Sequence, residues 1–151
     1  MREAEKDPDW REFRLQSVAH VANVLLDHIR SYHLRAACAV FPTPEISSRM
    51  VRQDWSRFKL DLALPMVYHS FYQESPAWAS VCAQQAAQQC ANRLPLAPGI
   101  HLPDSKPELL AEELDRLQAT SPAGIGLFCD DQLTPGMLQS ISRWASPSAR
   151  K

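Results

Sequence analysis

The chain of 151 residues has the length of a single domain, and its 45% hydrophobic and 22% charged residues are typical of a folded protein rather than a disordered one. Its formal net charge of −1 gives no electrostatic reason for binding nucleic acid or an anionic membrane. No apolar run approaches the roughly 20 residues that span a bilayer.

The N-terminal part of the chain predicts one long helix followed by a buried strand. Residues 1–8 are expected to be flexible, and Asp9 can cap a helix over 10–32. Apolar residues recur there at three- and four-residue steps, which gives the helix one apolar face. Residues 36–41 are wholly apolar and short, as in a strand buried on both faces of a parallel sheet. A short helix over 45–52 follows.

The rest of the chain repeats a strand-helix pattern. We expect strands over 60–66, 96–102 and 124–128, and helices over 76–90, from a cap at Asp104 or Ser105 to 120, and over 134–144. Residues 146–151 are expected to be a flexible tail, so that 9–145 form the domain. Strands that alternate with helices predict an α/β fold with about four parallel strands.

Two architectures fit this alternation. One is an open, doubly wound sheet with helices on both faces. The other is half of a (β/α)8 barrel, with helices on one face and an inner face carrying Cys38, Leu62 or Leu64, and Ile125 or Leu127. A half-barrel has two unpaired edge strands, so it is expected to pair with a missing N-terminal half or with a second copy.

Several segments carry a resemblance to a known family. The runs are Ala39-Val-Phe-Pro-Thr-Pro44, Val51-Arg-Gln-Asp-Trp55, Leu60-Asp61, and Pro65-Met-Val-Tyr68 with Phe71-Tyr72. They resemble the C-terminal half of the glycosyl-hydrolase-like TIM-barrel proteins, poorly characterised relatives grouped near glycoside hydrolase family ten, and the likeness covers almost the whole chain. It implies that the first four strands lie upstream and that a glycan-binding cleft forms at the C-terminal ends of the strands.

The catalytic candidates are Asp54 and His101. Asp54 lies beside Trp55 in the Gln-Asp-Trp element, and a structural role in a turn is equally open. His101 ends the third expected strand, where it could act as an acid, a base or a hydrogen-bond donor to a sugar. Glycoside hydrolysis needs two carboxyl groups across the bond that is cleaved. The large barrel glycosidases have a glutamate where this strand ends in His101, so a complete pair is not expected.

The substrate-binding candidates are mostly aromatic, because ring faces suit sugar rings. They are Trp55, Tyr68, His69, Tyr72, Asp104 and Asp130. Each has a structural alternative. Trp55 and the tyrosines can pack in the core, Asp104 can cap a helix, and Asp130 can hold a loop.

Other classes of site are not indicated. The four cysteines match no zinc or redox spacing, the histidines show no metal-ligand spacing, and no glycine-rich phosphate loop occurs. We therefore expect no metal, no cofactor, and a reduced, cytoplasmic chain, unless an export signal lies upstream of Met1.

The function expected from these observations is that of the C-terminal part of a glycoside hydrolase acting on a poly- or oligosaccharide, with little or no activity in this chain alone. The alternative is a non-catalytic half-barrel module that binds glycans or associates with itself. An unrelated small-molecule site in a doubly wound domain is the third interpretation.

Overall fold

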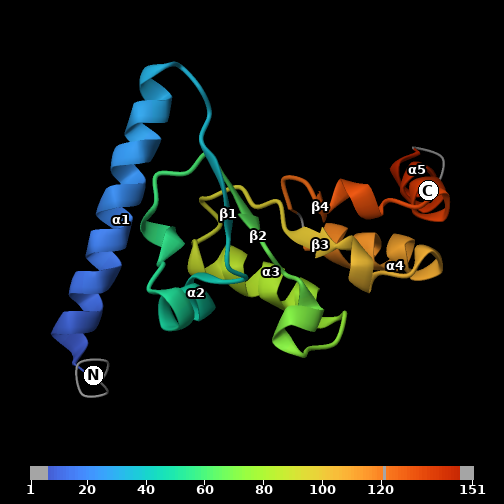
Figure 1. Cartoon of the computed structure of the whole chain (residues 1–151), viewed down its shortest axis with the longest axis horizontal. Helices are drawn as coiled ribbons and strands as arrows, with labels where there is room; N and C mark the ends of the chain where they lie inside the picture. Colours follow the sequence, from blue (N-terminus) through green and yellow to red (C-terminus); the bar gives the residue numbers. More distant parts are fainter. Residues whose placement is uncertain (1–6, 121, 147–151) are drawn as a thin grey trace.

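A computed structural model describes residues 7–120 and 122–146, in which five helices and four short strands alternate (Figure 1). The bounds are α1 Pro8–Ser31, β1 Ala37–Val40, α2 Pro44–Val51, β2 Leu62–Pro65, α3 Trp78–Gln89, β3 Gly99–His101, α4 Pro107–Gln118, β4 Gly126–Phe128 and α5 Pro135–Ala145. The predicted α/β class is confirmed.

The four strands form two parallel pairs joined by bridges. β1 pairs with β2, and β3 pairs with β4, both in parallel. Between the pairs, Ala63 bridges Leu96 and Met66 bridges Gly99, again in parallel. The strands therefore follow one another side by side in chain order, as short crossover connections favour. Every strand is shorter than the apolar run that predicted it.

The start of α1 differs from the prediction. The helix begins at Pro8, and the side chain of Asp7, not that of Asp9, accepts hydrogen bonds from the amides of Asp9 and Trp10. Proline is favoured in the first turn because its missing N–H needs no partner there. Residues 1–6 of the expected flexible segment, and all of the expected tail except Ser146, lie outside the described residues.

The predicted cap of α4 is wrong. Lys106 occupies the N-cap position and makes no side-chain capping bond. Asp104 instead ends the short 3₁₀ turn Leu102–Asp104, and the Ser105 hydroxyl donates to Glu113 at 2.5 Å. The Asp104 carboxylate accepts from the Ser70 hydroxyl, so neither Asp104 nor Ser105 caps α4.

Two hydrophobic clusters form the core. The first joins α1, β1, β2 and the end of α3 around the fully buried Trp55. The second joins α3, β3, α4 and Met137 of α5 around Leu102 and Leu110. The strand residues that contribute to these clusters share one face of the sheet: Cys38, Val40, Ala63, Ile100 and Leu127.

The opposite face of the sheet is covered by none of the described helices. Successive strand residues point to opposite faces, so register places the following on it: Ala37, Ala39, Leu62, Leu64, Met66, Gly99, His101, Gly126 and Phe128. We call this the open face. Leu62, Leu64 and Met66 are half-buried and belong to neither cluster. Leu62 and Leu64 were predicted on such a face, whereas Cys38, Ile125 and Leu127 lie on the helix-covered face because the alternation runs the other way.

The long helix α1 is attached largely by polar contacts. Only Leu15, Ala19 and Leu26 are buried along its 24 residues. The segment before β2 holds it through three ion pairs: Arg57–Glu12 at 2.6 Å, Lys59–Asp27 at 2.7 Å and Arg30–Asp61 at 3.2 Å. In Figure 1 this helix lies at one end of the molecule, beyond the edge strand β1.

Candidate functional site

Four rings gather at the C-terminal ends of β2, β3 and β4. We call Tyr68, Phe71, His101 and Phe128 the ring cluster. The Tyr68 and Phe128 rings stack with centroids 5.8 Å apart and an interplanar angle of 10°, and Tyr68 lies 5.4 Å from His101. Phe71 meets His101 edge-on at 4.8 Å. Because His101 and Phe128 lie on the open face, the cluster stands at the end of that face.

Gly99 makes room for Tyr68. A Cβ atom at this position would lie only 3.2 Å from the Cε1 atom of Tyr68. The tyrosine ring therefore lies against the bare backbone of β3, and Tyr68 is 9% exposed. Burial raises the pKa of the phenol, with a smaller contribution from nearby Cys129. A phenol is protonated at neutral pH even at its ordinary pKa, so the hydroxyl is a hydrogen-bond donor.

A carboxylate lies beside the rings. The Oδ2 atom of Asp104 is 2.9 Å from Nδ1 of His101 and accepts a hydrogen bond from the Ser70 hydroxyl. The Nδ1 atom is buried and makes no hydrogen bond of regular geometry, so its contact with Asp104 is one of charge. Burial raises the pKa of the Asp104 carboxyl, but the Ser70 bond and His101 outweigh it, and the net pKa is below the ordinary value.

His69 makes no ring contact with the cluster. Its Nδ1 atom is 3.1 Å from the Glu74 carbonyl, so in the neutral ring Nδ1 is the donor. Its Nε2 atom is buried without a hydrogen-bond partner. The ring lines a small cavity with Ile100, His101 and Arg116, among others. His69 therefore borders the site but does not join the ring cluster.

Asp54 and Trp55 lie away from the ring cluster. Asp54 accepts from Ser56 at 2.5 Å and from Arg57 at 2.8 Å, within its own turn. Trp55 is fully buried, and its indole N–H donates to the Phe41 carbonyl at 3.1 Å. The structure thus corrects the prediction of Trp55 as a sugar platform, and it gives Asp54 the role in a turn that was its alternative.

Tyr72 and Asp130 also lie apart from the cluster. The Tyr72 ring packs on Trp78 at the start of α3, with centroids 5.0 Å apart. Asp130 is exposed in the turn after β4, where its carboxylate accepts from the amide of Asp131. Of the predicted site residues, the structure brings together Tyr68, His101 and Asp104.

Three members of the site were missed from the sequence. Ser70 and Phe71 lie two and three residues after Tyr68, and Phe128 ends β4 as His101 ends β3. The rule that applied to His101, a side chain at the C-terminal end of a parallel strand, applies equally to Phe128.

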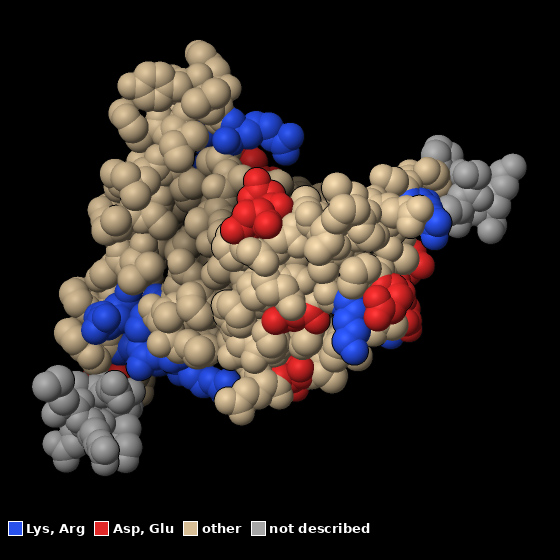
Figure 2. All heavy atoms as spheres, turned by 45° about the vertical axis from the view of Figure 1, so that its right-hand side comes forward, with Lys and Arg blue, Asp and Glu red and all other residues tan. Residues whose placement is uncertain are grey.

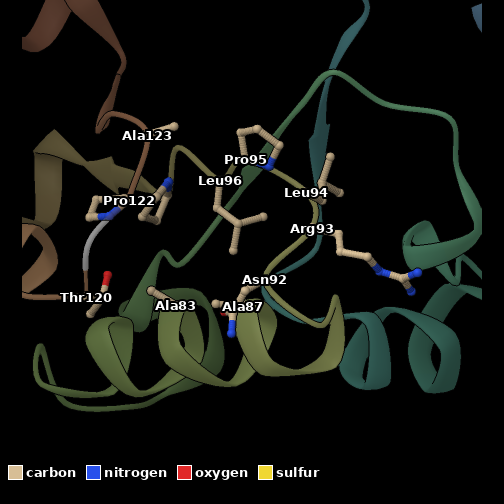
Figure 3. A pocket seen from close by; sticks show the side chains of 11 residues that line it. Ala83, Ala87, Asn92, Arg93, Leu94, Pro95, Leu96, Thr120, Pro122 and Ala123 are labelled. Carbon is tan, nitrogen blue, oxygen red and sulfur yellow. The ribbon is translucent and has the colours of Figure 1, made fainter.

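A second cavity of about 450 Å³ lies at the opposite ends of β3 and β4 (Figure 3). Alanine, proline and leucine side chains dominate its wall, and Arg93 is its one charged residue among those described. Figure 3 shows the Arg93 side chain pointing away from Leu96 and Ala123. A wall with one cation and no carboxylate offers no acid-base pair, so the ring cluster remains the better candidate site.

Within residues 7–120 and 122–146, no group of three or more His, Cys, Asp or Glu side chains is placed to hold a metal ion. None of the helices described is both long and apolar enough to cross a membrane. No family model matches the chain, and no curated protein matches it either.

Proposed function

We propose that this chain is the C-terminal half of a (β/α)8 barrel that binds an oligosaccharide at the C-terminal ends of its strands. The observation that supports the proposal most is the ring cluster at the end of a sheet face that none of the described helices covers. In a closed barrel the corresponding face is the interior, and ligands bind at the carboxyl ends of the strands.

The chemistry of the cluster suits a sugar. Phe71 is 65% exposed and Phe128 is 51% exposed, so both present ring surface to a ligand. Aromatic faces stack on the apolar C–H faces of sugar rings, while nearby polar groups bind the hydroxyls and fix orientation. Tyr68, His101 and Asp104 supply these polar groups.

Hydrolysis requires more than this chain offers. A glycosidase needs two carboxyl groups about 5 to 9.5 Å apart, and Asp104 is the one predicted acidic residue that contacts the ring cluster. We propose that the complete protein is a glycoside hydrolase whose other carboxyl group comes from the missing half-barrel. The alternative, a non-catalytic glycan-binding module, is supported by the same rings and the same lack of a pair.

The binding proposal is tested by titrating the chain with linear xylo-, cello- and chito-oligosaccharides, followed by NMR or calorimetry. Phe128→Ala should weaken binding about tenfold, the equivalent of one stacked ring. Phe13→Ala is the matched control, because Phe13 is 57% exposed but lies on α1, away from the cluster. No binding to any of these sugars, or an equal loss in both variants, contradicts the carbohydrate proposal.

The missing-half proposal is tested by assaying the same sugars for cleavage. We expect no turnover by the purified chain. Turnover that persists after Asp104→Asn and Asp54→Asn would show that the chain carries a catalytic pair not recognised among these residues.

A further inference from the structure

An apolar groove of about 610 Å³ runs between α1 and the edge strand β1, and we call it the slot. Its wall is almost entirely apolar, with Val18, Val21, Leu25 and Ile29 from α1 and Cys38 from β1. Figure 2 shows a mostly uncharged surface on this side of the molecule, over the upper part of α1.

Part of the β1 backbone has no partner strand on this side. The Val40 carbonyl accepts from Met66 of β2, so alternation directs the N–H and C=O groups of Ala37, which lines the groove, and of Ala39 away from β2. The Ala39 carbonyl accepts from the Cys38 thiol at 3.2 Å. In a parallel sheet covered by helices, each strand pairs with the edge of its neighbour and packs its side chains against an apolar helix. The groove between β1 and α1 offers both contacts to a further strand.

The same chain has a second free edge on β4. Gly126 donates to Pro98 beside β3, so Leu127 directs its backbone groups outward. Leu127 and Ile125 point to the helix-covered face, where they are only partly buried. A strand of this kind can pair with β1 while its apolar side chains lie under α1.

We propose that two copies of the chain form a closed dimer, in which β4 of each copy enters the slot between β1 and α1 of the other. This inference rests on the half-barrel part of the proposed function, and it puts a second copy in the position of the missing N-terminal half. A two-fold axis along the strands pairs both edges at once and keeps all strands parallel. The two open faces become the interior of one eight-stranded cylinder.

The exposed apolar surface is sufficient for such a dimer. Leu25, Ile29, Tyr32 and Leu34 on one side of the molecule, and Leu138 on the other, are between 37% and 65% exposed, and Val21 is 59% exposed. At roughly 100 Å² for each of these side chains, one copy contributes about 600 Å², three quarters of the ~800 Å² per partner of a standard interface. The edge backbones and the open face add to this area.

Two matched pairs of variants test the contact, with oligomeric state measured by light scattering and sedimentation. Val21→Lys places a charge in the slot and should raise the dimer dissociation constant about a hundredfold. Val24→Lys should leave it unchanged, because Val24 is 54% exposed but does not line the groove. On the β4 side, Leu138→Lys on α5 should weaken the dimer, and Leu109→Lys on α4, which is 45% exposed, should not.

A third pair tests the strand edge. Ala39→Pro removes an outward N–H and should give a folded monomer, because edge strands tolerate proline, whereas Ala39→Ser keeps the N–H and the dimer. Circular dichroism checks that each variant is folded. If Ala39→Pro unfolds, the lysine pairs still decide.

Several outcomes overturn the proposal. These are a wild-type monomer at all concentrations, open-ended oligomers, equal effects in the members of a pair, or loss of the dimer in the slot variant alone. If the chain is a dimer that binds no sugar, the carbohydrate proposal is contradicted and the dimer proposal stands. If the chain is a monomer that binds sugar, the dimer proposal is contradicted and the carbohydrate proposal stands.

Discussion

The ring of Tyr68 occupies the space that a side chain at position 99 would need. The nearest approach, 3.2 Å to Cε1, is tighter than ordinary van der Waals contact, and Tyr68 cannot easily withdraw because Phe128 stacks on it. A single missing Cβ atom therefore fixes where the ring cluster forms.

Replacing Gly99 by alanine should destabilise the protein by about 1 kcal/mol, because overpacking forces the Tyr68 ring out of its position. Gly124→Ala is the control, since its nearest contact would be an ordinary 3.9 Å to Ala97 and its φ is not positive. Urea unfolding of both variants measures the difference. Equal stabilities would mean that Tyr68 is free to move.

Asp104 makes the protein sensitive to acid. Its folded pKa is lowered, so it contributes stability above its unfolded pKa, and this contribution is lost as pH falls through the folded pKa. Asp104→Asn should cost about 1 kcal/mol at neutral pH, and the difference should shrink below about pH 4. Unfolding at pH 7 and pH 3 tests this, with the exposed Asp130→Asn as control. A cost that does not change with pH would contradict it.

The sequence locates part of this site for a physical reason. Side chains at the C-terminal ends of parallel strands must meet at one end of the sheet, which brings Tyr68 and His101 together. The Gln-Asp-Trp element places Asp54 beside Trp55 in the chain, but sequence proximity does not tell which way the indole points. Trp55 is fully buried in the first hydrophobic cluster, and its indole N–H donates to the Phe41 carbonyl.

At the scale of elements, apolar runs and proline positions predict all the helices and strands in their order. They do not predict the short length of the strands, because apolar residues that flank a strand, such as Leu60 and Leu96, are buried in loops. Nor do they predict which strand residues face the helices. That depends on register, which is a property of two strands together.

The N-terminus of α4 lacks a side-chain cap. Lys106→Asn should supply a carbonyl oxygen to the amide of Glu108, since the Leu109 amide already donates to the Lys106 carbonyl at 2.9 Å, and should stabilise the protein by about 0.5 to 1 kcal/mol over Lys106→Ala. The thermal midpoints of these two variants measure the gain. Equal midpoints would show that the Glu108 amide gains nothing from a cap.

The whole molecule is asymmetric, with helices on one face of its sheet and exposed apolar side chains on the other face and along α1. A dimer that covers this surface predicts that the unfolding temperature rises with protein concentration, since association stabilises only the folded state. Scanning calorimetry over a range of concentrations measures the shift. Val21→Lys should remove it, and a concentration-independent wild type would argue against association.

Because α1 is held largely by polar contacts, we expect it to detach from the rest of the domain before the core unfolds. Its ion pairs are partly exposed to solvent, with side chains about one third to one half accessible, and such pairs weaken as salt screens them. The connection from Ser31 to Arg35 is exposed as well. High salt should therefore let trypsin sever the chain there before it reaches the core, leaving a shortened fragment that keeps α3, α4 and α5.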